Sequence, residues 1–232
     1  MSTQIILVPG FWLGAWAWDE VASRLRERGF DVTALTLPGL EEGGSGQSGA
    51  TLQDHADAIG QALDEGADRR ILVAHSGAAF PATWVVDCSP ELVDRLVLVD
   101  TAPPVDGLAF NAEAAEDFTL EQAWAELEEE GSFGGLSEAH LEEFRRRAVP
   151  QPRDVVATPI RLQNEARKSV PVTAICTLFD SKGYQQYAEQ GVPFVAGLLE
   201  YEVDYVDLPT GHWPMWSKPA ELADLIAEAA GK

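Results

Sequence analysis

Ser76 stands between a run of apolar residues, 71–74, and a run of small residues, 77–79. An apolar run followed at once by small residues is typical of a buried strand that turns sharply into a helix. On such a turn the small neighbours let two segments of backbone approach, and the serine hydroxyl is exposed as a nucleophile. The usual pattern is G-x-S-x-G, and Ala74 and Ala78 replace its outer glycines here. Because serine is also a common first residue of a helix, this segment alone leaves a structural cap as the alternative.

A nucleophilic serine needs a base, and the chain has four histidines: His55, His75, His140 and His212. His212 lies in the segment 208–215, after the last predicted strand and before the last predicted helix. Chemistry in an open parallel sheet gathers at the carboxyl ends of the strands, so we predict that His212 meets Ser76 and acts as its base. His55 and His140 are expected to be solvated. His75 is expected to pack beside the turn, because consecutive residues leave a tight turn in different directions.

The base needs an acid that fixes its tautomer and stabilises the imidazolium, and this acid should follow an intermediate strand. Asp180 is the preferred candidate because it follows the apolar run 174–179. Asp100, at the end of the preceding predicted strand, is the alternative, and would otherwise hold the strand end in place.

Acyl transfer also needs two backbone N–H groups that stabilise the negatively charged oxygen of the tetrahedral intermediate. One comes from the residue after the nucleophile and one from the loop after the first strand, here residues 9–14. We assign these donors to Gly77 and Phe11.

Large apolar side chains flank the predicted catalytic loops, and an acyl pocket is commonly lined by such residues. We expect the substrate to contact Trp12, Trp213, Met215 and Trp216. Packing in the core is the alternative for each of them.

Six short β-branched or leucine-rich runs recur along the chain, at residues 5–8, 32–35, 71–74, 96–99, 172–177 and 202–206. Most are continuously apolar, which is typical of strands covered on both faces and therefore of a parallel sheet. Amphipathic segments such as 52–63 and 222–229 separate or follow them and predict flanking helices. The sequence thus predicts an α/β fold with a mostly parallel sheet of about six strands.

Residues 103–169 interrupt this alternation, because they contain helical patterns and no convincing strand. We predict a small helical cap over 103–169, inserted into a core made of 1–102 and 170–232. Thr119 and Gln122 have the spacing of a capping box for the first cap helix. A second helix is predicted from about Ser137 to Pro150 and a third over 155–168, and the glutamates at 128–130 are expected to be a solvated helix end.

The composition excludes several classes of partner. With 16 Lys and Arg against 38 Asp and Glu, the net charge of −22 would repel nucleic acid and anionic lipid surfaces. Solubility explains this acidity, with adaptation to a salty interior as the alternative. No apolar run approaches the roughly 18 residues needed to span a bilayer.

Cys88 and Cys176 lie in a predicted helix and strand and are expected to be reduced thiols. The chain begins without a basic leader, so we expect a single-domain cytoplasmic protein, monomeric or homodimeric, that acts on a small molecule.

Three motifs in this order resemble the α/β-hydrolase superfamily, and within it the small methylesterase and hydroxynitrile lyase group. They are the segments 10–16, 74–78 and 211–222. Pro9 stands where members of the group usually have a histidine. The lyases rely on a threonine and a lysine at places that hold Gly10 and Trp213 here, and epoxide hydrolases and haloalkane dehalogenases carry aspartate at the place of Ser76.

The residues and the resemblance together predict a serine hydrolase that cleaves a small, uncharged, partly apolar ester, lactone or thioester through an acyl-enzyme on Ser76. No metal or other cofactor is expected. Because fold does not fix reaction, a cofactor-free lyase and a non-catalytic small-ligand receptor remain as alternatives.

Overall fold

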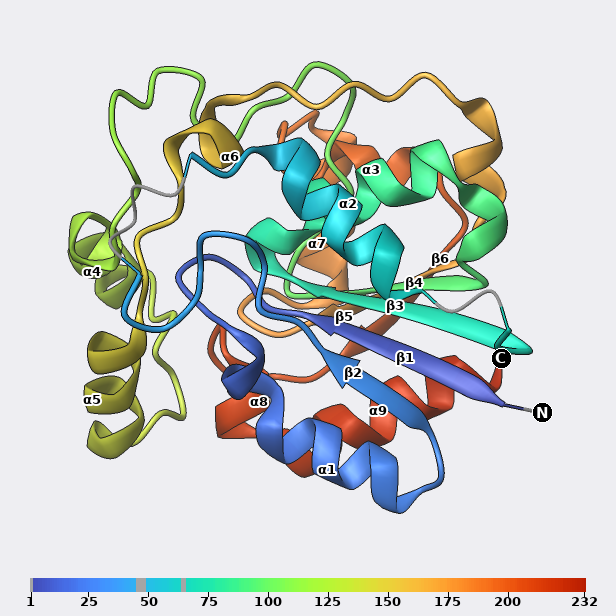
Figure 1. Cartoon of the computed structure of the whole chain (residues 1–232), viewed down its shortest axis with the longest axis horizontal. Helices are drawn as coiled ribbons and strands as arrows, with labels where there is room; N and C mark the ends of the chain where they lie inside the picture. Colours follow the sequence, from blue (N-terminus) through green and yellow to red (C-terminus); the bar gives the residue numbers. More distant parts are fainter. Residues whose placement is uncertain (1, 45–48, 64–65) are drawn as a thin grey trace.

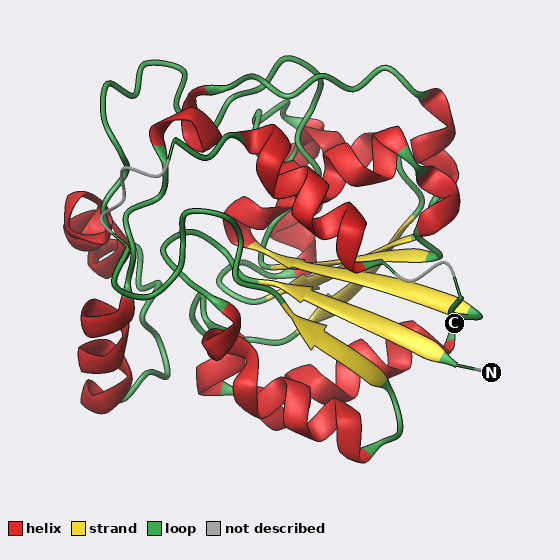
Figure 2. Cartoon of the chain, viewed as in Figure 1, coloured by secondary structure: helices red, strands yellow, loops and turns green. Residues whose placement is uncertain are grey.

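The computed structural model describes residues 2–44, 49–63 and 66–232. Its six strands form one sheet in the order β2-β1-β3-β4-β5-β6, and every neighbouring pair is parallel (Figures 1 and 2). The strands are β1 (Thr3–Val8), β2 (Asp31–Ala34), β3 (Arg69–His75), β4 (Arg95–Val99), β5 (Val172–Cys176) and β6 (Val203–Asp207). The predicted parallel sheet is confirmed, and each strand lies within a few residues of its predicted run.

Helices flank both faces of the sheet. The helices of the described ranges are α1 (Asp19–Glu27), α2 (Leu52–Ala62), α3 (Ala79–Cys88), α4 (Leu120–Glu129), α5 (Glu138–Arg147), α6 (Arg153–Ala157), α7 (Ser181–Glu189), α8 (Pro214–Ser217) and α9 (Pro219–Gly231). Figure 1 shows α1 and α9 on one face, with α2 and α3 on the other. None of the helices in the described ranges is long and apolar enough to cross a bilayer.

The two faces of the sheet bury separate cores, because successive side chains of a strand point in opposite directions. In β1, Ile5 and Leu7 pack in the cluster that includes side chains of α1 and α9. Ile6 and Val8 pack in the cluster that includes α2 and α3. Strands covered in this way must be apolar on both faces, which is why their sequences are continuous apolar runs.

Residues 103–169 contribute no strand to the sheet and carry α4, α5 and α6. The capping box of α4 forms as predicted, with Thr119 Oγ1 accepting from the Gln122 N–H and the Gln122 side chain accepting from the Thr119 N–H. Figure 2 shows α4 and α5 at the end of the molecule toward which the strands point. This insertion therefore stands beside the carboxyl ends of the strands.

The third predicted helix of the insertion, 155–168, is wrong. The chain forms the short α6 and then runs without helix to a 3-10 turn, Glu165–Ser169. Pro159 is the physical reason, because proline lacks an N–H and disfavours helical backbone at the residue before it.

Candidate active site

Ser76 follows β3 directly and has a φ of 53°, in the left-handed region that residues other than glycine rarely adopt. Two other non-glycine residues among those described share this feature: Trp12, with φ 68°, in the loop after β1, and Asp100, with φ 48°, directly after β4. Backbone strain of this kind gathers at functional sites. All three residues lie at the carboxyl ends of adjacent strands, so the strain marks one edge of the sheet.

Close backbone approach explains which residues around Ser76 must be glycine. A Cβ at Gly10 would come within 2.9 Å of Ser76 Cβ, and a Cβ at Gly77 would come within 2.3 Å of the Phe11 ring. Ala74 and Ala78, at the places where the motif usually has glycine, are buried and pack in the cluster with α2 and α3. The turn therefore requires glycine at 10 and 77, whereas alanine fits at 74 and 78.

Ser76, His212 and Asp100 form a continuous line of hydrogen bonds. His212 Nε2 lies 2.8 Å from Ser76 Oγ, and His212 Nδ1 lies 2.6 Å from Asp100 Oδ2. Because a carboxylate only accepts, Nδ1 donates to Asp100, and Nε2 is left to accept the serine hydroxyl. The structure therefore brings Ser76 and His212 together as the sequence predicts.

Asp100 is almost fully buried but well supplied with donors. Its Oδ1 accepts from the Thr177 N–H and the Leu178 N–H, each at 3.1 Å, and from the Tyr184 hydroxyl at 3.0 Å. Burial by itself would raise the pKa of Asp100, but the hydrogen bonds and charge of His212 and the two backbone donors lower it below its ordinary value. Burial, together with Asp100, raises the pKa of Tyr184 well above 10.0, so its hydroxyl remains a donor. The site thus holds an ionised carboxylate beside His212.

Asp180, the acid preferred from the sequence, is not the carboxylate that the structure places against His212. Asp180 is exposed and caps α7, where its Oδ1 accepts from the Gly183 N–H at 2.8 Å. It stands four residues beyond the end of β5, whereas Asp100 follows β4 directly. The backbone that leaves β5 donates to Asp100 through Thr177 and Leu178, which places the alternative acid, and not Asp180, against His212.

The backbone of His212 is held from two sides. Its carbonyl accepts from Nε2 of the buried His75 at 2.7 Å, and its N–H donates to the Ser132 carbonyl at 2.7 Å. Burial lowers the pKa of His75 to about 3, so its ring is neutral and Nε2 carries the hydrogen. His75 therefore packs beside the turn as expected and fastens the His212 loop to β3.

The turn 131–135 of the insertion supplies the other side of this support. The Gly211 N–H donates to the Gly134 carbonyl at 3.0 Å, next to the bond from His212 to Ser132. A Cβ at Gly211 would come within 2.4 Å of the Ser132 carbonyl oxygen. The insertion thus contacts the His212 loop closely enough to require glycine at 211.

The remaining histidines do not join the site. The prediction that His55 is solvated is wrong, because its ring is buried and Nε2 lies 2.9 Å from the Pro38 carbonyl. His140 is half-buried and stacks on Trp216, with ring centroids 6.4 Å apart.

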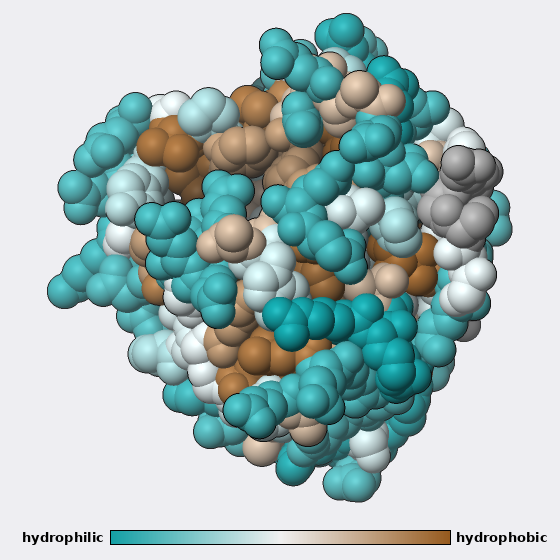
Figure 3. Space-filling view, turned by 90° about the vertical axis from the view of Figure 1, so that its left-hand side faces the viewer, coloured by the Kyte–Doolittle hydropathy of each residue, from teal (hydrophilic) through white to brown (hydrophobic). Residues whose placement is uncertain are grey.

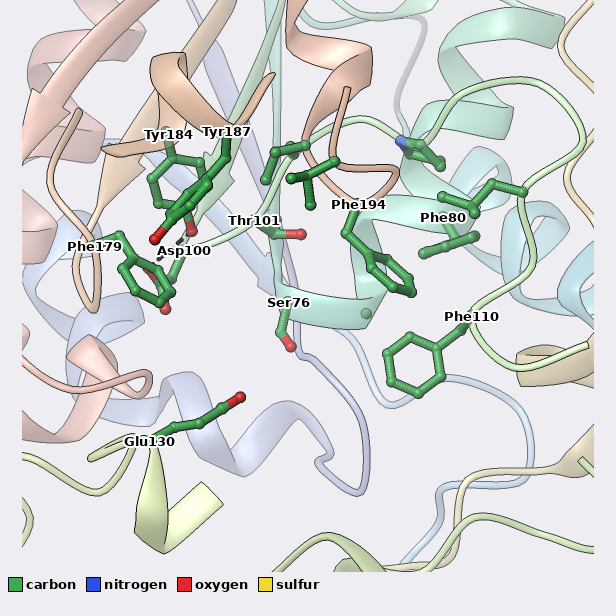
Figure 4. Close-up of a pocket in the computed structure, with 16 residues that line it drawn as sticks. Ser76, Phe80, Asp100, Thr101, Phe110, Glu130, Phe179, Tyr184, Tyr187 and Phe194 are labelled. Carbon is green, nitrogen blue, oxygen red and sulfur yellow. Dashed lines mark hydrogen bonds between the residues drawn. The ribbon is translucent and has the colours of Figure 1, made fainter. Parts of the chain in front are cut away.

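A cavity of about 490 Å³ opens at Ser76. Its lining is mostly aromatic and aliphatic, and it includes Phe80, Phe110, Phe179, Tyr184, Tyr187 and Phe194 (Figure 4). Apolar patches interrupt the hydrophilic surface on the face toward which the strands point (Figure 3). The site therefore joins a candidate nucleophile to an apolar binding cavity.

The predicted pocket residues lie elsewhere. Trp12 and Trp213 are buried in the core cluster with α1 and α9. Met215 belongs to the same cluster and, with Trp216, borders a separate cavity that Trp16 and His140 also line. Packing in the core, the alternative for each of these residues, holds for Trp12, Trp213 and Met215. No signal in the sequence separates Phe179, Tyr187 or Phe194 from core residues, since aromatic residues in α7 and in the loops on either side of it also fit ordinary packing.

A sequence model described as the alpha/beta hydrolase family matches residues 5–225. The chain belongs to the alpha/beta hydrolase family. This confirms the family that the three motifs suggested, and it agrees with the parallel sheet and the turn at Ser76.

This alpha/beta hydrolase is similar to proteins with named activities, one in sequence and others in fold. A carbendazim-hydrolysing esterase from Nocardioides sp. (strain SG-4G) is 33% identical over 107 residues, which cover 45% of this chain and 44% of the esterase. A pyrethroid hydrolase from Sphingobium faniae has a TM-score of 0.68 at 22% identity, covering 100% of this chain and 98% of that one. Tomato methylketone synthase I, as a variant complexed with β-ketoheptanoate, has a TM-score of 0.73 at 17% identity, covering 100% and 98%. The two solved structures show the shared fold.

Proposed function

We propose that this protein is a serine esterase in which Ser76 is the nucleophile, His212 the general base and Asp100 the acid that orients the histidine. The observation that carries the proposal is the hydrogen-bond line from Ser76 Oγ through His212 to Asp100, with distances of 2.8 and 2.6 Å. Because Asp100 accepts the Nδ1 hydrogen, Nε2 has its lone pair directed at the serine hydroxyl. This arrangement can remove a proton from Ser76 as the oxygen attacks.

The reaction would proceed in two steps. Ser76 Oγ bonds to the carbonyl carbon while its proton passes to His212 Nε2, and the bond to the alcohol then breaks as the alcohol takes that proton. In the second step, the oxygen of a water molecule bonds to the carbonyl carbon of the acyl-enzyme while His212 Nε2 takes its proton. The bond to Ser76 Oγ then breaks as Oγ takes that proton, and the carboxylic acid leaves. Asp100 stays ionised throughout and stabilises the imidazolium. The steps need no metal or other cofactor.

The backbone N–H groups of Phe11 and Gly77 are the proposed donors to the tetrahedral oxyanion. The close packing of Gly10 against Ser76 and of the Phe11 ring against Gly77 supports this assignment, because it fixes the loop after β1 against the turn. A donor held rigidly before the reaction stabilises developing charge without reorganisation.

The lining of the cavity supports a small, partly apolar substrate: an uncharged carboxylic ester, lactone or thioester. Phe80, Phe110, Phe179 and Phe194 are among the aromatic residues that line it together with Ser76. The carbendazim-hydrolysing relative supports a hydrolytic reaction over the lyase alternative. Place in the cell and oligomeric state remain as the sequence predicts, a cytoplasmic monomer or homodimer.

Turnover of a panel of p-nitrophenyl esters of increasing acyl length tests the proposal. Ser76→Ala should lower kcat by at least about a thousandfold, since the serine forms the covalent bond. Ser169→Ala is the matched control, because Ser169 is exposed and lies outside the cavity lining. Unchanged turnover in Ser76→Ala would contradict the esterase.

Cyanohydrins and β-keto acids belong on the same panel, because a lyase can use the same three residues. Faster Ser76-dependent cleavage of these compounds than of any ester would replace the esterase by a lyase.

A further inference from the structure

The charged side chains that line the substrate cavity, among the described residues, are all acidic. Of the described residues that line it, Glu130 and Asp100 are acidic, and none is lysine, arginine or histidine. Asp100 is buried and accepts hydrogen bonds from His212 and three other donors, so its charge is already compensated by these groups. Glu130 is exposed, and its side chain points into the cavity on the side of Ser76 (Figure 4). It is therefore the carboxylate that a bound ligand meets.

The turn that carries Glu130 is held in place. Glu130 is the residue directly after α4, and the Gly131 and Ser132 N–H groups that follow donate to carbonyls of that helix. The Ser132 carbonyl in turn accepts from the His212 N–H. The Glu130 side chain thus projects from a backbone fixed to the His212 loop.

Exposed aromatic side chains gather at the same cavity. Among the described residues, five large hydrophobic side chains are exposed, and four of them line the cavity: Phe179 at 48%, Tyr187 at 41%, Val192 at 37% and Phe194 at 47%. Aromatic faces attract cations through their quadrupoles, and a carboxylate nearby adds Coulomb attraction. The Glu130 carboxylate is exposed, and its Oε2 accepts a hydrogen bond of 3.5 Å from Ser132 Oγ. Aromatic walls with one exposed carboxylate are complementary to an alkylammonium group.

We propose that Glu130 makes the cavity select ligands that carry a positive charge, so that the preferred substrates are esters bearing an amine or quaternary ammonium group, and carboxylate-bearing esters are rejected. This inference rests on the proposed esterase; it keeps the small, partly apolar ester as substrate class but replaces the uncharged substrate stated there with one that carries a positive charge. The carboxylic acid formed on hydrolysis is an anion, so Glu130 also repels this product.

The test measures binding to the Ser76→Ala protein by calorimetry, so that it does not depend on turnover. The probes are phenyltrimethylammonium, its neutral isostere tert-butylbenzene and the anion benzoate. The cation should bind more tightly than the isostere, and benzoate more weakly than either. Glu130→Gln should reduce the ratio of cation to isostere affinity by about three- to tenfold. Raising the salt concentration should reduce the same ratio.

Glu129→Gln is the matched control, because Glu129 is exposed, immediately precedes Glu130 and does not line the cavity. It should leave the affinity ratio unchanged. An unchanged ratio in Glu130→Gln, or an equal fall in Glu129→Gln, would overturn the inference. Unimpaired ester turnover in Ser76→Ala would instead contradict the proposed function while leaving the dependence of binding on Glu130 intact.

Discussion

Asp100 and Asp180 show that the distance of a residue from the end of its strand decides whether its side chain reaches His212. Both follow strands of one parallel sheet, so their order along the chain does not separate them. The difference is that Asp100 follows β4 directly, as Ser76 follows β3, whereas Asp180 is far enough from β5 to begin α7. The contact between Ser76 and His212 could be predicted from their neighbours in the sequence, but the contact between Asp100 and His212 required the turn geometry that only the structure gives.

The same substitution at these two aspartates gives opposite expectations. Asp100→Asn should lower kcat by about a thousandfold or more, because an amide cannot stabilise the imidazolium and favours the wrong histidine tautomer. Asp180→Asn should keep nearly full activity, since asparagine caps a helix about as well as aspartate. Steady-state kinetics on a p-nitrophenyl ester compare the two. Equal losses, or a larger loss in Asp180→Asn, would reverse the assignment.

The buried His75 predicts a dependence of stability on pH. Its folded-state pKa is about 3, against an ordinary value of 6.5, so between these values the unfolded chain binds the extra proton. Stability should therefore fall as the pH drops below 6.5, and His75 alone should account for about 2 kcal/mol between pH 7.5 and 5.

Urea unfolding of the wild type and His75→Gln at both pH values measures this effect, because the other titrating groups are common to both proteins. Glutamine keeps an N–H donor for the His212 carbonyl but does not titrate. The variant should lose about 2 kcal/mol less than the wild type on acidification. Equal losses would show that His75 does not stay neutral in the folded protein.

At the scale of elements, the strands could be predicted well and the insertion less well. Strands buried on both faces have continuous apolar sequences, as residues 5–8 and 96–99 show, so they stand out from the rest of the chain. The helix predicted over 155–168 has the right periodicity, but Pro159 interrupts it. The aromatic residues of the cavity, among them Phe179 and Phe194, could not be separated from core residues, because exposure depends on the packing of distant elements.

The contact between the turn 131–135 and the His212 loop predicts an effect on catalysis. Gly211→Ala should push these segments apart, because the new Cβ would lie 2.4 Å from the Ser132 carbonyl oxygen. A small displacement of the base costs catalysis strongly, so kcat should fall about 10- to 100-fold while KM changes less. Steady-state kinetics, with circular dichroism to show that the fold persists, test this.

Gly60→Ala is the control for an added methyl group, since nothing lies within 4 Å of a Cβ at Gly60, inside α2. It should keep its activity and gain up to about 1 kcal/mol of stability from the better helix former. Full activity in Gly211→Ala would show that the insertion does not hold the His212 loop.

For the whole molecule, the net charge of −22 predicts a response to salt. Like charges repel in the compact state more than in the unfolded chain, and added salt screens this repulsion. The Tm should rise between low salt and about 0.5 M NaCl by several degrees. Differential scanning calorimetry over this range, with sucrose as an uncharged control, measures the effect. A Tm that falls with NaCl would show that ion pairs outweigh the net repulsion.

The claim on which the whole account depends is that Ser76 is a nucleophile activated by His212. A fluorophosphonate probe forms a covalent bond with such a serine, and mass spectrometry of the digested protein locates it. We expect stoichiometric labelling at Ser76, with labelling abolished in Ser76→Ala and slowed by orders of magnitude in His212→Ala. Labelling at another residue, or labelling of Ser76 at the same rate without His212, would contradict the account.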